Sequence, residues 1–539
     1  MRNKLHKLPK YLVCSKLQIL LLQSNAGICD IPETFLQSPN ALRVFDLSST
    51  SISSLPQSFN VLTSLQALNL DFCSNLSEIS VLENLKKLEI LSMRELPLKN
   101  LPKQIGNLTN LRKLDVTGRS LETIPSEVLS KLCRLEELHL KFQFGKWGSK
   151  IEDASEETNA NFDELTGLPD LNILEVYISD ATCLPQSVEY FKPNWVEFDI
   201  CISRDVLLPQ YDGFSRTLTL DTTINSLPDW FISIVTAKVE QLEYTNCDDL
   251  NDLVGEYDHG RLFVLKYLSV NGHHKNLKEI INTMRRVSNK PVFENLEELH
   301  LHCLYSLEEL CVGELPPGSL RKLKLLKVQT CHSLVNALLS LTLLPRLQNL
   351  EKIICVHLDR MKYVFGSDEV GVDPEKIFLR KLREMRLCAL EELVRICNGP
   401  ASHAIFQNLK VLAICKCKEL KSLFTIDVAE CLFQLEDLCI EQCPRLDRVI
   451  EASNSLNSEI TLPALKRLAL IDLPVLTRFC TEGGNIETRC PSLEYLSVKN
   501  CIKFSYFANS HFSKKEIHFN DLDHLSSLEE RWKEMHNQL

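Results

Sequence analysis

One apolar motif recurs along almost the whole chain at intervals of roughly 23 residues. It has the spacing leucine, two residues, leucine, one residue, apolar residue, and clear copies begin at Leu42, Leu88 and Leu111, each followed by a Leu-Pro or Ile-Pro pair. A unit this short cannot bury its apolar residues alone, so consecutive units must stack and share one core. The repeat therefore predicts a solenoid, whose long surface is suited to binding.

Each copy of the motif predicts one short strand. The alternation places the second and third apolar residues on the core side, while the residues between them face the other way. We predict an α/β repeat fold, a curved horseshoe with a parallel β-sheet on its concave face and about 19 irregular repeats. The copies start at Leu17, Leu42, Leu65, Leu88, Leu111, Leu135, Leu171, Trp195, Leu218, Val239, Leu265, Leu296, Leu323, Leu350, Leu382, Leu409, Leu435, Leu465 and Leu493.

The repeats predict one elongated domain over residues 1–510. Residues 142–166 contain a run of acidic side chains, and we expect a surface loop there that is too polar to pack. Residues 511–539 carry Leu525 and Trp532 at helical spacing. This tail is either a capping helix or a frayed terminus.

The 21 cysteines do not form the pattern of a disulfide framework. Six of them share the turn position that follows a strand, which predicts buried packing thiols in a reducing compartment. Because no apolar run reaches the ~18 residues of a membrane span and the start lacks a secretory signal, we expect a cytoplasmic protein that meets membranes only through partners. The six are Cys73, Cys247, Cys331, Cys417, Cys443 and Cys501.

The net charge of -11 argues against general nucleic-acid affinity, which needs a clustered basic face. On the predicted concave face, basic residues of three neighbouring strands adjoin acidic residues of the next four. We predict that this face binds a protein, although solvated strand positions would give the same pattern. The predicted binding residues are Arg94, Lys113, His139 and Lys141, then Glu175, Glu197, Asp199, Asp221 and Glu243, with the aromatic Tyr177 and Tyr495.

The sequence contains no motif for catalysis. It has no phosphate-binding loop, no H-E-x-x-H pair and no G-x-S-x-G turn. The nearest metal-like groups are His300 with His302 and Cys303, and Cys415 with Cys417, but neither has the ligand spacing of a zinc site. We therefore expect no enzyme, no cofactor and no metal.

Three kinds of repeated segment in this sequence resemble the leucine-rich repeats of plant intracellular disease-resistance receptors. Those receptors are of the coiled-coil, nucleotide-binding class. The three kinds of segment are the units ending in Leu-Pro, as in 42–56, the later units with a cysteine in the turn, as in 409–420 and 435–446, and the phrase at 101–111. The resemblance covers nearly the whole chain.

The resemblance implies a sensor in plant defence. Such a region recognises a pathogen effector or a modified host protein, and it restrains a nucleotide-binding switch on the same or another receptor chain. No motif of that switch occurs in this sequence, so it would have to lie outside this chain. The alternative is a free-standing intracellular leucine-rich-repeat scaffold or a substrate adaptor of a ubiquitin ligase.

Overall fold

The structure is a computed structural model in which the chain forms two compact units, unit 1 (Met1–Asp249) and unit 2 (Leu250–Leu539). The tail 511–539 lies outside the described residues. The structure describes residues 5–37, 40–142, 144–151, 157–187, 193–205, 213–251, 253, 262–284, 290–340, 342–366, 379–398, 405–451, 459–480 and 487–504.

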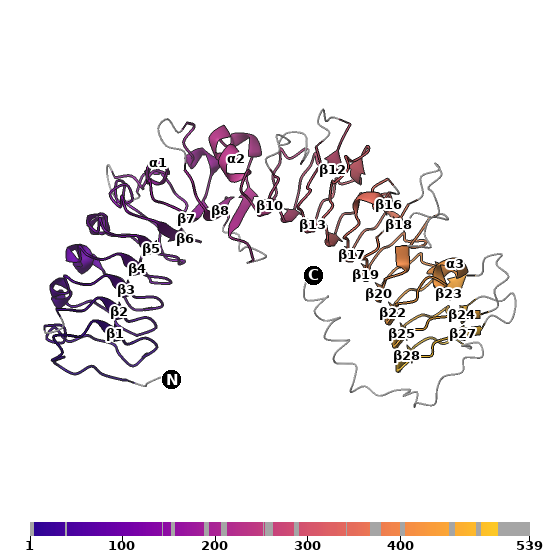
Figure 1. Ribbon diagram of the computed structural model, residues 1–539, viewed down its shortest axis with the longest axis horizontal. Coiled ribbons are helices and arrows are strands. Elements are labelled where there is room, and N and C mark those ends of the chain that lie inside the picture. The colour runs from indigo at the N-terminus through magenta and orange to yellow at the C-terminus, as the bar shows by residue number, and fades with distance from the viewer. Residues whose placement is uncertain are drawn as a thin grey trace. The chain divides into compact units, whose positions relative to one another are not determined.

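Unit 1 is built on a parallel sheet whose neighbouring strands follow one another along the chain (Figure 1). Each strand coincides with a copy of the apolar motif, including the weaker copies between residues 195 and 245. Its strands are β1 (Ile19–Leu21), β2 (Val44–Asp46), β3 (Ala67–Asn69), β4 (Ile90–Ser92), β5 (Lys113–Asp115), β6 (Glu137–Leu140), β7 (Ile173–Ile178), β8 (Glu197–Ser203), β9 (Arg216–Asp221) and β10 (Gln241–Thr245).

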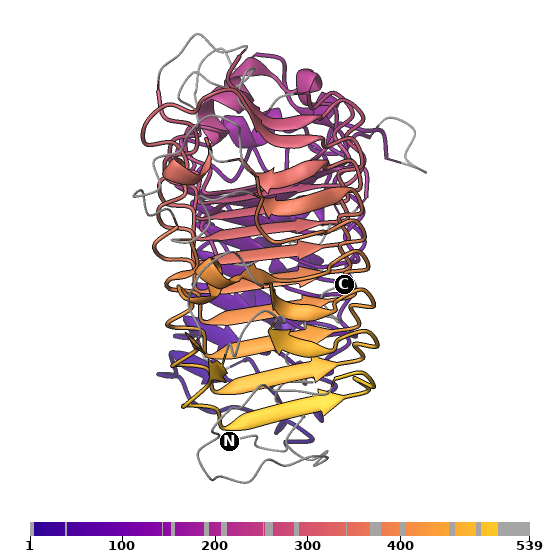
Figure 2. The same cartoon turned by 90° about the vertical axis from the view of Figure 1, so that its right-hand side faces the viewer.

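Unit 2 repeats this arrangement with longer coils, and Figure 2 shows its parallel strands as successive rungs. Together with unit 1, these strands occupy every motif position, so the predicted parallel repeat solenoid is confirmed. The main strands of unit 2 are β11 (Tyr267–Asn271), β13 (Glu298–His302), β15 (Leu325–Gln329), β17 (Lys352–Val356), β19 (Glu384–Cys388), β20 (Val411–Cys415), β22 (Asp437–Glu441), β25 (Arg467–Ile471) and β28 (Tyr495–Lys499).

The return segments of the coils contain short helices in unit 1 and mostly short strand ladders in unit 2. The helices are η1 (Gln57–Val61), η2 (Ser80–Asn84), η3 (Lys103–Asn107), α1 (Asp163–Thr166), η4 (Ala181–Cys183), η5 (Ile224–Ser226), α2 (Asp229–Val235), η6 (Leu344–Arg346) and α3 (Ile426–Ala429). The ladder strands are β12 (Glu279–Asn282), β14 (Glu309–Val312), β16 (Asn336–Leu339), β18 (Met361–Phe365), β21 (Phe424–Thr425), β23 (Arg448–Glu451), β24 (Glu459–Thr461), β26 (Arg478–Cys480) and β27 (Glu487–Arg489).

The core of each coil consists of the three apolar residues of the motif. In the coil of β5, Leu111 and Leu114 are fully buried and Val116 is 6% exposed. The residues between them face away from the core, on what we call the concave face of the sheet. Stacking thus removes the apolar side of every coil from water while leaving one row of side chains for contacts.

A tight turn ends most of the main strands, and there the residue two positions after the motif adopts a left-handed backbone. Ser49, Thr330 and Lys416 have φ values of 55°, 54° and 55°. Most residues at this position are neither glycine nor asparagine, so residue type alone gave no signal for it.

The predicted turn cysteines are buried except for Cys501, which is partly exposed. Their thiols donate to backbone carbonyls, as Cys73 Sγ does to Leu47 O at 3.1 Å. Burial raises the pKa of Cys247 and of Cys331 to about 12, so both stay protonated and inert at neutral pH. The described structure keeps all six as packing thiols.

One disulfide, which the sequence did not indicate, joins Cys388 and Cys415. The two residues are in register at the ends of the neighbouring strands β19 and β20. Their sulfur atoms lie in a small apolar cluster with Val356 and Ala389.

The expectation that residues 142–166 are too polar to pack is wrong for both ends of that segment. Phe144, Trp147 and Phe162 are at most 3% exposed, and their rings meet edge to face with centroids 4.9 and 5.4 Å apart. Phe162 continues the contact to Trp195, the core residue that opens the β8 motif. The aromatic residues therefore tie this insertion to the core, because their buried area outweighs the polarity of the residues around them.

Among the described residues, no helix combines the length and the apolar character needed to cross a membrane.

Candidate protein-binding face

Ten of the eleven predicted binding residues lie in unit 1, on or directly after strands β4 to β10. The eleventh, Tyr495, begins β28 in unit 2 and is partly exposed. Parallel register brings the centre of the set together, because His139 is opposite Glu175 and Glu175 is opposite Asp199. Side chains opposite each other on one face of a sheet are close enough to interact directly.

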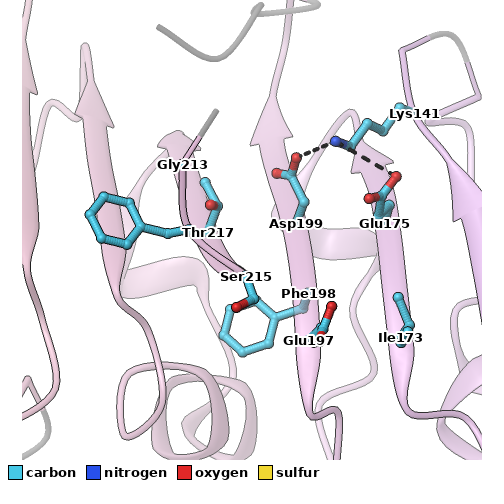
Figure 3. Close-up of a pocket in the computed structure, with 10 residues that line it drawn as sticks. Lys141, Ile173, Glu175, Glu197, Phe198, Asp199, Gly213, Ser215 and Thr217 are labelled. Atoms are coloured by element: carbon cyan, nitrogen blue, oxygen red, sulfur yellow. Dashed lines mark ion pairs between the residues drawn. The ribbon is translucent and has the colours of Figure 1, made fainter. Parts of the chain in front are cut away.

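The central contacts join β6, β7 and β8. His139 Nδ1 lies 2.9 Å from Glu175 Oε2, and Lys141 Nζ lies 2.6 Å from Asp199 Oδ2 and 3.6 Å from Glu175 Oε2. Figure 3 shows the Lys141 side chain reaching between the two carboxylates. These side chains keep between 13% and 28% of their surface exposed, so their contacts are only partly screened by water.

This geometry shifts the protonation of the histidine. Burial disfavours the charged imidazole, but the hydrogen bond and negative charge of Glu175 outweigh it, so the pKa of His139 is raised. Burial also opposes ionisation of Glu175, yet His139 and Lys141 together lower its pKa. Both directions agree with a charged pair that is favoured near neutral pH.

The remaining predicted cations also have acidic partners. Lys113 Nζ lies 2.6 Å from Glu137 Oε2, and Arg94 Nε lies 3.8 Å from Asp115 Oδ2. The interpretation of the four cations as a separate basic patch therefore overlooked Asp115 and Glu137. The sequence could have indicated both acidic partners, because Asp115 and Glu137 occupy the same concave-face positions between motif leucines as the predicted residues.

A pocket of about 410 Å³ opens beside this network (Figure 3). Glu175, Glu197 and Asp199 line it together with a single cation, Lys141. Glu197 is exposed and forms no ion pair within the described part of the chain. The pocket consequently carries surplus negative charge. Its other lining residues are Ile173, Phe198, Gly213, Phe214, Ser215 and Thr217.

Three other predicted residues are less accessible than their positions suggest. Tyr177 is 6% exposed and donates its hydroxyl to Ser203 O at 2.8 Å. Glu243 is 5% exposed and accepts a hydrogen bond from Gln241, and Asp221 accepts one from Ser203. As binding residues, all eleven remain a prediction.

Within the described residues, no group of three or more histidine, cysteine, aspartate or glutamate side chains is placed to hold a metal ion. The predicted metal-like histidines make other contacts. His300 Nε2 lies 3.1 Å from Glu298 Oε2, and His302 Nδ1 lies 2.9 Å from Asn271 Oδ1.

Comparison with known proteins agrees with the repeats and the sheet. Residues 1–253 match the family described as "Leucine-rich repeat region", and residues 295–444 match "Plant disease resistance protein RPS2-like, leucine-rich repeats". The chain is a leucine-rich-repeat region of the plant disease-resistance type.

This leucine-rich-repeat chain is similar to curated proteins of Arabidopsis thaliana. It is 27% identical to disease resistance protein At4g27190 over 78% of this chain and 43% of that protein. It is 30% identical to probable disease resistance protein At4g27220 over 78% of this chain and 46% of that protein. The chain therefore spans less than half of the length of these relatives. A solved structure of a TDR receptor shares 14% identity over 90% of this chain and 86% of that chain, with a TM-score of 0.44.

Proposed function

We propose that this leucine-rich-repeat chain is the protein-recognition region of a plant disease-resistance receptor. Its concave face would bind a pathogen effector or a host protein altered by one, and the complex would release a nucleotide-binding switch that this chain does not contain. The relatives, which are named disease resistance proteins, support the defence role.

The observation that carries the proposal is the pocket over β6 to β9. A repeat solenoid offers its concave face as one continuous surface, and among the described residues that line this pocket three carboxylates share one lysine. His139 contacts Glu175 from outside the pocket, so negative charge still exceeds positive charge here. Electrostatic complementarity favours a partner that presents lysine or arginine side chains, since these would restore the missing charge.

The first experiment measures binding of purified pathogen effectors to the wild-type chain and to Glu197→Lys. We expect at least one effector to bind and the reversal to weaken it by about tenfold, as for removal of one charge-assisted contact. Asp170→Lys is the matched control, because Asp170 is exposed in a turn outside the pocket. Equal affinity of every effector for both variants, or no binding to the wild type, would reject the proposal.

A second experiment tests the restraint of the switch. We propose that strands β4 to β6 bind the nucleotide-binding module of the receptor through Lys113 and Lys141. Reversing both to glutamate should weaken binding of the purified module, and the loss should shrink as salt is raised. Unchanged affinity would contradict this docking site.

A further inference from the structure

The concave face of unit 2 contains a cation that differs from those of unit 1. Lys327 lies in the middle of β15, opposite His300 on β13 and Ile354 on β17. It is half-buried, and it forms no ion pair with any residue that the structure describes. In unit 1, by contrast, Lys113 and Lys141 each have a carboxylate 2.6 Å away.

The next two strands, β17 and β19, carry two more cations and one carboxylate on the same face. On β17, Lys352 Nζ lies 3.1 Å from Glu384 Oε1, and Arg386 on β19 contacts the same carboxylate. Lys327, Lys352 and Arg386 thus lie on three successive strands, and the carboxylate of Glu384 contacts only the last two. A local cation surplus in a chain of net charge -11 indicates a site that attracts anions.

Two side chains near Lys327 bear on this site. Gln329 offers a further hydrogen-bond donor, and the pKa of His302 responds to the charge of Lys327. Gln329, on the same face of β15, is 8% exposed, and its side-chain amide makes no hydrogen bond among the described residues. Burial and then the charge of Lys352 lower the pKa of Lys327. Burial and the charge of Lys327 likewise lower the pKa of His302.

We propose that Lys327 and Gln329, together with Lys352 and Arg386, form an anion site that binds the carboxylates of an acidic segment of a protein partner. Two strand spacings separate Lys327 from Arg386, or about 10 Å, which is too far for one phosphate and suits two carboxylates on an extended segment. Ile354 lies between them in the register of the sheet and packs against the apolar cluster around the Cys388 to Cys415 disulfide, so it offers apolar contact to the same segment.

Calorimetric titration with acetylated hexaglutamate at low ionic strength tests the site. We expect the wild type to bind this peptide, Lys327→Gln to bind at least tenfold more weakly, and Lys327→Arg to retain binding because it retains the charge. Lys324→Gln is the matched control, since its amino group is already paired with Glu297. No binding to the wild type, or equal affinity for Lys327→Gln, would overturn the proposal, as would tighter binding of inorganic phosphate.

His302 gives a second readout that does not depend on calorimetry. In NMR titrations of the imidazole, both Lys327→Gln and saturation with hexaglutamate should raise the pKa of His302 towards its ordinary value. Lys327→Arg should leave it low in the free chain. A pKa that stays unchanged when the peptide binds would place the peptide elsewhere and overturn the site.

This inference rests on the proposed function only in taking the concave face as the partner surface. The peptide test needs neither an effector nor a nucleotide-binding module. Failure of hexaglutamate binding would therefore remove the anion site and leave effector recognition in unit 1 intact. Failure of the effector test, with peptide binding retained, would remove effector recognition in unit 1 and leave the anion site intact.

Discussion

At the scale of single residues, the main interactions on the concave face of unit 1 are charge pairs whose partners come from different repeats. His139 and Glu175 are 36 positions apart in the sequence, yet their strands are neighbours and their side chains meet at 2.9 Å. The pair is coupled, because the pKa of the histidine is raised while that of the glutamate is lowered. Such a pair makes the stability of unit 1 depend on pH.

We predict that unit 1 loses stability as the pH rises above about 6.5, the ordinary pKa of histidine. Because the pKa of His139 is raised in the folded state, the protonated imidazole stabilises that state fully below the ordinary histidine pKa. This contribution disappears as the pH rises through the pKa of the folded state. Chemical unfolding of wild type and His139→Gln at a series of pH values measures the effect. The variant should be less stable by roughly 1 kcal/mol at pH 6, and the difference should narrow towards pH 8.5. A pH-independent difference would contradict the coupling.

A second residue-scale prediction concerns the left-handed turn position. Lys416 is exposed with a φ of 55°, which a β-branched residue tolerates poorly. Lys416→Val should therefore destabilise unit 2 by about 1–2 kcal/mol, while Lys416→Asn should be neutral or stabilising. Lys421→Val, at an exposed position without positive φ, is the control. Equal unfolding midpoints for the two valine variants would show that the turn carries no strain.

At the scale of elements, the insertion between β6 and β7 depends on a chain of aromatic contacts. Phe162 links Trp147 to Trp195, with ring centroids 5.4 and 6.3 Å away. Gly145 also fits closely, because a Cβ there would lie 2.6 Å from the Tyr177 ring. The insertion is thus an integral part of its coil at both ends.

We predict that Phe162→Ala destabilises unit 1 by about 3–5 kcal/mol, since it removes a buried ring and leaves a cavity. The same variant should expose the insertion to limited proteolysis. Phe433→Ala is the matched control, because that ring is 57% exposed and its loss should change stability by about 0.5 kcal/mol or less. Similar destabilisation by both substitutions would show that the aromatic contacts do not anchor the insertion.

At the scale of the whole molecule, the chain has two compact units, each with its own stacked core. Leu114 and Leu412 occupy the same motif position, one in each unit, and both are fully buried. In a repeat solenoid each coil contacts chiefly its neighbours, so damage should stay close to the substituted coil.

We predict that Leu114→Ala and Leu412→Ala each cost about 2–5 kcal/mol and that each lowers amide protection in its own unit. Hydrogen exchange followed by mass spectrometry separates the two effects. If either substitution reduced protection equally in both units, the chain would unfold as one cooperative block, contrary to this expectation.

The sequence by itself determined the fold and the face of the sheet on which the residues between the motif leucines lie. Period and alternation are local properties, and burial of the motif leucines enforces them in every coil, so each predicted strand is present. It also indicated the buried turn thiols, because their position repeats in register. The alternation within the motif likewise placed ten of the predicted binding residues on one face of unit 1.

Only the tertiary structure decided which side chains meet. The partners of Lys113, the burial of Tyr177 and the Cys388 to Cys415 disulfide all depend on strands brought together by stacking. The sequence also could not show that Lys327 forms no ion pair with the residues that the structure describes, since a lysine between motif leucines looks the same whether or not a carboxylate lies opposite. The physical reason is that cross-strand distances of a few ångströms set these interactions, whereas coil lengths vary too much for sequence spacing to give them.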